Sequence, residues 1–322
     1  MELTPDFSIM INGQEGFPKD RVISIQTTDE AGIISDSCEI ELDDYDNALK
    51  FPNTEAKIVL HLGYKETGLD KIGTYFVKEI SLNGARRIVK IHGNAAPKAM
   101  RSQKTQSNEG TISKFISDAA SALGFSSKTS DSASNIDLKD NPQIAESNMS
   151  YVTRLVNKIG AIVKPTDEKI VMAENMSGKS ASGKSLPTKY IEAKDVASYD
   201  CIFRETETKG TKGTVFACWY DRKTGKYNLE KAGNGDPETE IKEVFATKEQ
   251  AAAAAKARLK QTEKSNKTMR FTIEGRTDLF AESPLILKGF SEKVPTKWTI
   301  QRVNHSLSAN GFTTNLECCG SI

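Results

Sequence analysis

The strongest constraint on the fold is a succession of short strand-like runs, without any helical periodicity, across about the first 95 residues. Gly, Asn, Asp or Pro separates the runs, and residues 39–42 (EIEL) alternate polar and apolar side chains as a half-buried strand does. The pair Asn83-Gly84 between two runs predicts a hairpin turn. Strands that follow one another without a helix favour an antiparallel barrel or sandwich. The runs cover residues 7–13, 21–29, 37–44, 56–64, 72–84 and 86–93.

The composition then changes, and two amphipathic segments appear. Residues 111–123 and 148–159 each place apolar side chains on one helical stripe, and a glycine follows each segment. Two short strands are predicted after the second helix, at residues 161–164 and 169–173. We therefore expect a small α+β domain over residues 98–176.

Strand patterns return in the C-terminal part, where one long helix interrupts them. Thr247 and Gln250 form a capping box before an alanine-rich segment, which predicts a helix over residues 247–264. Between residues 298 and 307 the apolar alternation changes phase, and a β-bulge near residues 301–302 would explain the change.

The predicted fold class is therefore mainly β with an α+β insert. We expect two β-barrel-like, tube-forming domains, at residues 1–97 and 188–322, and the second of these carries the long helix at 247–264. The α+β domain at 98–176 stands between them, followed by a flexible Ser/Gly/Lys linker at 177–187.

Charge and composition weigh against several classes of function. Lys and Arg total 44 against 43 Asp and Glu, and this net charge of +1 lacks the basic excess of proteins that grip nucleic acid through phosphates. No apolar run approaches the ~18 residues needed to cross a bilayer. The N-terminus lacks the layout of a signal peptide, and the five scattered cysteines suit a reducing compartment. We expect synthesis in the cytoplasm, no secretion by signal peptide and no membrane insertion.

One segment matches the phosphate-binding pattern G-x-x-x-x-G-K-S, through Gly178, Gly183, Lys184 and Ser185. Such a loop binds phosphate because it opens directly into a helix whose N-terminal N–H groups face the anion. Here Pro187 follows, and the next residues alternate as a strand does. Because the segment is almost entirely Ser, Gly and Lys, we interpret the match as a product of composition and predict no bound cofactor.

A second candidate is an acidic segment without Lys or Arg. A calcium loop would need a glycine at the sixth ligand position and a closing glutamate, and both are missing. The alternatives are a polar strand face and an acidic interface rim that faces a basic partner. The residues of this rim are Asp36, Glu39, Glu41, Asp43, Asp44 and Asp46.

No other pattern indicates catalysis or metal binding. His61, His92 and His305 each stand alone on a predicted strand, without a second ligand at metal spacing. The nucleophile and zinc-protease motifs are absent. We predict no catalytic residue, no metal site and no enzymatic activity.

In the order and spacing of its segments, the chain resembles the phage late control protein D family, the tail baseplate hub proteins of contractile-tailed phages. The resemblance extends over nearly the whole length. It rests on PDFSIMING, EIELDD, IVLHLGY and GTYFVKEI near the start, on ESNMSYVTRLVNKIGA and KIVMA in the middle, and on VFATKEQAAAAAKARL and WTIQRVNHSLSANGFTTNLE near the end.

The resemblance implies a homotrimer that joins the hexameric tail tube to the threefold central spike. Each chain would supply two barrel-like domains, so that three chains form a pseudo-sixfold ring. The implied partners are the tail tube protein, the spike protein, the tape measure protein and possible further baseplate proteins, with DNA only as passing cargo. The implied location is the baseplate of the virion.

Two alternatives stay open. The chain is also compatible with the hub or spike component of a type VI secretion system or another contractile injection system. The second alternative is a tail-associated protein that binds or hydrolyses the cell wall.

Overall fold

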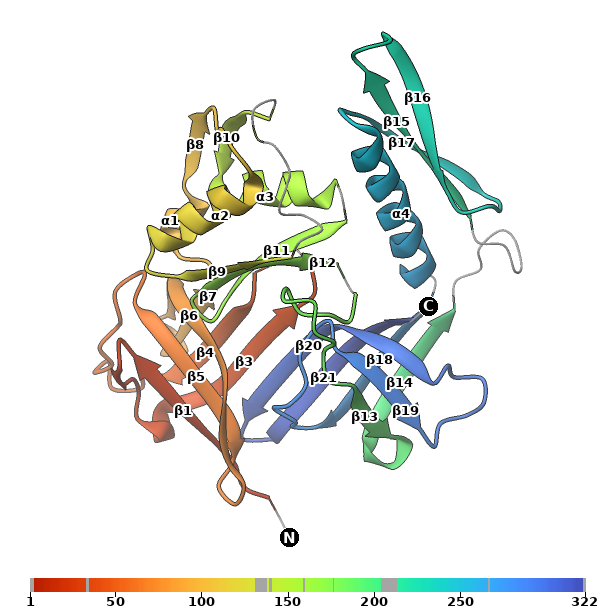
Figure 1. The fold of residues 1–322 in the computed structure, drawn as a ribbon. Helices are drawn as coiled ribbons and strands as arrows, with labels where there is room; N and C mark the ends of the chain where they lie inside the picture. Colours follow the sequence, from red (N-terminus) through yellow and green to blue (C-terminus); the bar gives the residue numbers. More distant parts are fainter. Residues whose placement is uncertain are drawn as a thin grey trace.

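A computed structural model describes residues 3–32, 35–130, 138, 141–158, 160–175, 177–203, 213–265 and 267–320 (Figure 1). Strands dominate the described chain, as predicted. Hydrophobic side chains gather in four clusters within these residues, one for each structural region defined below.

The first region, here called the N module, contains every strand predicted for the first 95 residues. The predicted turn at Asn83-Gly84 joins its two strands β6 and β7. Its elements are β1 (Pro5–Ile11), β2 (Gln14–Glu15), the 3-10 turn η1 (Lys19–Arg21), β3 (Val22–Glu30), β4 (Ser37–Asp43), β5 (Lys57–Tyr64), β6 (Gly68–Asn83) and β7 (Ile88–Asn94).

The second region, here called the insert, confirms both predicted helices. The hydroxyls of Thr111 and Ser147 accept hydrogen bonds from backbone N–H groups in the first turns of the two helices, as N-caps do. Position 159, the last of the second predicted helix, lies outside the described residues. The elements are α1 (Lys98–Arg101), β8 (Gln103–Gln106), α2 (Ile112–Ser121), β9 (Ser126–Thr129), β10 (Gln143–Ser147), α3 (Asn148–Asn157), β11 (Ala161–Thr166) and β12 (Lys169–Glu174).

The remaining chain forms two regions. The C module consists of β13 (Lys189–Glu192), the 3-10 turn η2 (Ala193–Asp195), β14 (Val196–Phe203), β18 (Lys267–Glu274), β19 (Pro284–Lys288), β20 (Lys297–Ser308) and β21 (Gly311–Gly320). The helical unit consists of β15 (Thr214–Asp221), β16 (Lys226–Ala232), β17 (Glu238–Phe245) and the predicted long helix α4 (Lys248–Ser265). Figure 1 shows α4 alongside the three-stranded sheet β16-β15-β17, on its inner side.

The two modules share one sheet of 13 strands. The strand order is β14-β18-β21-β20-β3-β4-β7-β6-β5-β1-β2, with β19 beside β20 and β13 beside β19. Residues 302–308 of β20 pair with residues 24–30 of β3, and we call this pairing the joint. The order does not close on itself within the described residues, so the expected barrels are not closed in a single chain: β3 pairs with the other module's β20.

The modules repeat one topology. Within each, the strands occupy equivalent places in chain order and in the sheet: β1, β3, β4, β5, β6 and β7 correspond to β13, β14, β18, β19, β20 and β21. One difference is that β1 pairs antiparallel with β5, whereas β13 pairs parallel with β19. The repeat shows that both modules are versions of the same six-stranded unit.

Irregularities in strand pairing repeat as well. The β3–β4 register shifts between Val22 and Ser24, and the β14–β18 register shifts at the equivalent place. The β6–β7 register shifts between Val77 and Glu79, and the β20–β21 register between Ile300 and Arg302. The last shift is the bulge predicted near residues 301–302. Two matched bulges align the modules residue by residue.

A close contact across the joint makes one glycine sensitive to substitution. The Tyr64 hydroxyl donates a hydrogen bond to the Gly275 carbonyl over 3.0 Å, and the Tyr64 and Phe312 rings lie 5.6 Å apart. A Cβ atom at Gly275 would lie 2.1 Å from the Phe312 ring. Phe312 is buried in the core of the N module, although it belongs to the C-terminal hairpin.

We expect Gly275→Ala to lower the free energy of unfolding by roughly 1–3 kcal/mol, because the Phe312 ring must move within a packed core. Urea denaturation measures the change. Gly84→Ala is the matched control for unfolding of the single chain, since a Cβ atom there meets nothing within 4 Å in that chain. Equal losses in the two variants would contradict the explanation.

Candidate functional site

A buried cluster of charges lies where the N module, the insert and the C module meet. Lys164 of β11 places its Nζ 2.6 Å from Asp29 Oδ1 and 2.6 Å from Asp36 Oδ1, and donates to the Glu30 carbonyl over 2.7 Å. From the C module, the Ala281 N–H donates to Asp29 Oδ2 over 2.8 Å. One lysine of the insert therefore contacts both ends of the β3–β4 connection, and Asp29 also contacts the C module.

The two carboxyl groups of this cluster titrate differently. Burial and the neighbouring Asp29 charge raise the pKa of Asp36 to about 7. Burial opposes ionisation of Asp29 too, but the Lys164 charge and the hydrogen bonds from Lys164 and Ala281 outweigh it and lower the pKa of Asp29. Burial likewise opposes the charge on Lys164, yet both aspartates together raise its pKa. One ion pair, Asp29 with Lys164, is thus fully charged near neutral pH, while Asp36 is partly protonated.

Further pairs attach the tip of the β11–β12 hairpin to the N module. Asp167 accepts hydrogen bonds from Lys71 and Thr74, and Glu168 accepts from Lys57 over 3.0 Å. The ion pairs are partly exposed, with side-chain exposures of about 40%, so each adds little stability by itself. Together with the buried cluster they fix the insert on the sheet.

The phosphate-loop look-alike packs beside this cluster. Ala181 of the loop is buried, and Lys179, Ser180, Ala181 and Leu186 line a cavity of about 410 Å³ that Asp29, Asp36 and Lys164 also line.

The loop is a tight hairpin. The Ser180 N–H donates to the Lys184 carbonyl over 2.8 Å, and the Leu186 N–H donates to the Gly178 carbonyl over 2.7 Å. Strand β13 follows, and no α-helix begins in residues 177–203. The arrangement therefore lacks the helix N-terminus through which such a loop holds phosphate.

The six residues of the predicted acidic rim do not form one surface. Asp36 belongs to the buried cluster, and the Asp44 side chain is buried, where it accepts from the Leu49 N–H over 3.0 Å. Asp46 pairs with Arg21 at the end of the sheet. Glu39, Glu41 and Asp43 point from β4 to the face opposite the core, because the buried positions of this strand alternate with them.

The histidines lie in different surroundings. His305 is buried, its Nδ1 lies 3.0 Å from the Thr314 hydroxyl, and burial lowers its pKa to about 4. His92 lies beside Glu39 at 3.2 Å, and His61 is on β5. Within the described residues, no group of three or more His, Cys, Asp or Glu side chains could hold a metal ion. The same part of the chain has no helix with the length and apolarity of a membrane span.

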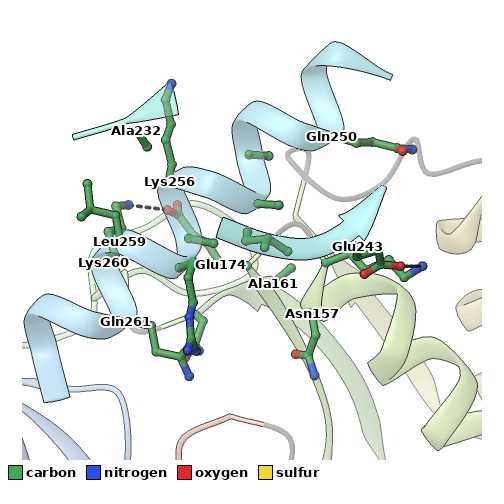
Figure 2. A pocket seen from close by; sticks show the side chains of 18 of the residues that line it. Asn157, Ala161, Glu174, Ala232, Glu243, Gln250, Lys256, Leu259, Lys260 and Gln261 are labelled. Carbon is green, nitrogen blue, oxygen red and sulfur yellow. Dashed lines mark hydrogen bonds and ion pairs between the residues drawn. The ribbon is translucent and has the colours of Figure 1, made fainter. Parts of the chain in front are cut away.

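A groove of about 1890 Å³ separates the insert from the helical unit. Figure 2 shows Glu174 of the insert reaching Lys260 of α4, and Asn157 and Ala161 of the insert line the same groove. Two ion pairs cross it, Lys260 with Glu174 at 2.8 Å and Lys158 with Glu243 at 2.5 Å. These pairs connect the insert to the helical unit.

Sequence reasoning missed the buried cluster. The sequence pattern places Asp36 on the acidic rim, and Lys164 follows three apolar residues on a short strand without any motif around it. Asp29 ends one predicted strand and Asp36 stands just before the next, which is the one signal that they lie close together.

Comparison with known proteins gives a consistent result. A model of the family described as phage tail baseplate hub (GPD) matches residues 129–311. A probable baseplate hub protein of Escherichia phage 186 is 27% identical and aligns over 98% of this chain and 92% of that protein.

Two solved structures have a similar fold. A 43 kDa tail protein of prophage MuSo2 from Shewanella oneidensis superposes with a TM-score of 0.69 at 11% identity, covering 98% of each chain. An Escherichia coli component of the type VI secretion system superposes with a TM-score of 0.58 at 10% identity, covering 98% of this chain and 77% of that one.

We expect Asp36→Asn to stabilise the protein at pH 8. The pKa of Asp36 is raised on folding, so the wild-type carboxyl loses stability as the pH rises from about 4 through about 7. Asparagine accepts the same hydrogen bonds without a charge. The gain in unfolding free energy should be at most about 4 kcal/mol at pH 8 and should vanish near pH 4. Urea titrations at both pH values measure it, and a pH-independent difference would contradict the assignment.

Proposed function

Since the chain belongs to the phage tail baseplate hub (GPD) family, we propose that it forms a homotrimer that joins the hexameric tail tube to the threefold central spike. The family consists of structural components of the phage tail baseplate. The resemblance drawn from the sequence segments is thereby confirmed. The finer proposal rests on the duplicated six-stranded module.

The duplication supports a match between two symmetries. Each chain has two modules of one topology, so three chains around a threefold axis present six similar modules. A sixfold tube could then contact six comparable surfaces, while a threefold spike contacts three identical chains. No reactive group is needed for this role.

The open strand order supports a tube made by several chains. In one chain the joint connects two modules through main-chain pairing, and the sheet continues through both. In this proposal the sheets of three chains together form one closed barrel, and the tape measure protein and DNA pass through it.

The polar face of the sheet suits such a channel. Opposite the two cores it carries charges of both signs, and three of its cations pair with carboxylates: Lys90 with Glu39 at 3.2 Å, and Arg270 and Arg302 with Glu317 at 2.9 and 3.3 Å. Cations that are paired in this way attract passing phosphates less strongly than free cations do. We therefore assign Glu39 and Glu41 of the acidic segment to the channel, and Asp46 to the end of the sheet as a possible contact for a docking partner.

A second candidate, the hub of a type VI secretion system, is favoured by the fold shared with the Escherichia coli component. The proposed trimeric architecture would suit either function. Genes for a tail tube, sheath and spike beside phage replication or lysis genes would support the phage tail, and a secretion locus would support the alternative.

We expect the purified protein to form a particle of three times the 35.3 kDa chain mass. Light scattering coupled to size-exclusion chromatography, over a range of concentrations and with the tail tube protein added, measures it. A particle that is monomeric in every condition would contradict the proposed trimer.

We expect Glu39→Lys combined with Glu41→Lys to increase DNA binding by roughly tenfold or more at low salt, because the change adds cations beside Lys90. The gain should fall steeply as salt rises, as measured by fluorescence anisotropy with a short DNA duplex.

The matched control is Glu249→Lys combined with Glu292→Lys, since both residues are exposed and lie off the sheet face. This variant changes the net charge equally and should bind DNA much more weakly. Equal binding by both variants would show that total charge, rather than the proposed channel face, decides the affinity.

A further inference from the structure

Among the described residues, β14 and the end of β6 are two of the strand edges of the large sheet that have no further strand partner. Strand β14 pairs only with β18, and beyond Val77 strand β6 pairs only with β7. Unpaired edges of this kind leave backbone N–H and C=O groups available to another strand. One edge belongs to each module.

Large apolar side chains are exposed at both edges, although they occupy core-facing positions. Leu82 on β6 lies opposite the buried Val89 and is 55% exposed. Tyr199 on β14 lies opposite the buried Phe271, and Tyr199 and Phe203 are each 51% exposed. Directly opposite residues point to the same face, so these side chains face the interior and lack a cover only on the edge side.

The joint shows how equivalent positions are covered. By the matched bulges, β6 corresponds to β20 and β14 to β3. In the joint, Ile25 and Thr27 of β3 lie opposite Leu307 and His305 of β20, and all four side chains are buried. Tyr199 and Leu82 occupy the positions equivalent to Ile25 and His305.

We infer that β14 of one copy pairs antiparallel with the end of β6 of a second copy, in the register of the joint. This inference rests on the proposed trimer and specifies its interface, which we call the seam. Transfer of the register gives these pairs: Ile80 with Phe203, Ser81 with Ile202, Leu82 with Cys201, and Asn83 with Asp200.

The seam accounts for the exposed apolar groups. Leu82 and Phe203 become covered on the core-facing side, and Tyr199 lies opposite Gly84, where the missing side chain leaves room for its ring. Each copy offers β14 to one neighbour and β6 to the other, so the interface is heterologous and closes as a ring. Six sheet connections result, three within chains and three between them.

The seam predicts a disulfide between copies from one substitution. Cys201 is a free, partly exposed thiol. In Leu82→Cys the new thiol would lie opposite Cys201 of the neighbour. Cα atoms of opposed antiparallel residues lie about 4.5–5.5 Å apart, which is within the range for disulfides. With oxidised glutathione as oxidant, we expect covalent dimers and trimers on a non-reducing gel.

Two controls fix the register. Leu82→Cys combined with Cys201→Ser should give no cross-link, which identifies the partner thiol. Ser81→Cys places a thiol one position away, on the other face of the strand and opposite Ile202, and should cross-link at least about tenfold less. Equal cross-linking of the Ser81 and Leu82 variants would overturn the register.

A charged substitution at the seam tests the same interface without a cross-linking reaction. Tyr199→Asp should convert the trimer to monomers, whereas Tyr190→Asp, at a similarly exposed tyrosine on β13, should leave it intact. Circular dichroism confirms that both variants fold.

A trimer that neither cross-links through Leu82→Cys nor responds to Tyr199→Asp would overturn the seam and leave the hub trimer standing. A wild-type chain that is monomeric in every condition would overturn both.

Discussion

The pairing of β20 with β3 is the interaction on which the architecture depends. It joins strands more than 270 residues apart, converts two six-stranded modules into one sheet, and places residues of the C-terminal hairpin in the N-terminal core. The bulge in β20 separates the half of the strand that pairs with β19 from the half that pairs with β3. Beside this bulge Arg302 pairs with Glu30 at 2.7 Å. This ion pair lies where β20 stops pairing with β19 and begins to pair with β3.

The buried cluster of Asp29, Asp36 and Lys164 depends on that joint. Removing these carboxyl groups and an ammonium from water carries a large desolvation cost. The cluster offsets it through the Asp29–Lys164 ion pair, the partial protonation of Asp36 and the backbone N–H groups that its oxygens accept. Apolar residues of the same volume could be equally stable. The ion pairs and hydrogen bonds of a charged cluster form only when its groups occupy defined positions. The cluster therefore fixes how the insert and both modules pack against one another.

Much of this fold follows from the sequence, because strand alternation, helix caps and turn pairs are local signals. The phase change near residue 301 located the bulge, and Thr247 located the start of α4. Strand β17 was missed, since its charged sequence alternates weakly and its place is set by parallel pairing with β15. The joint could not be predicted either, because no local sequence pattern indicates which strand pairs with β3. Barrel closure was expected for the same reason: strand patterns specify faces but not partners.

The two modules differ mainly in what is attached to them, and this difference has a geometric consequence. The β3–β4 connection is short and is held by Lys164 of the insert, whereas the equivalent β14–β18 connection contains the whole helical unit. Figure 1 shows the insert and the helical unit on the same end of the sheet, and ion pairs connect them across their groove. In a ring of three chains, surfaces built from the bare modules would repeat six times. Surfaces built from the insert and the helical unit would repeat only three times, because the two have different folds. In the proposed trimer, a duplicated sheet with unequal attachments at one end would therefore present both a pseudo-sixfold and a threefold set of surfaces.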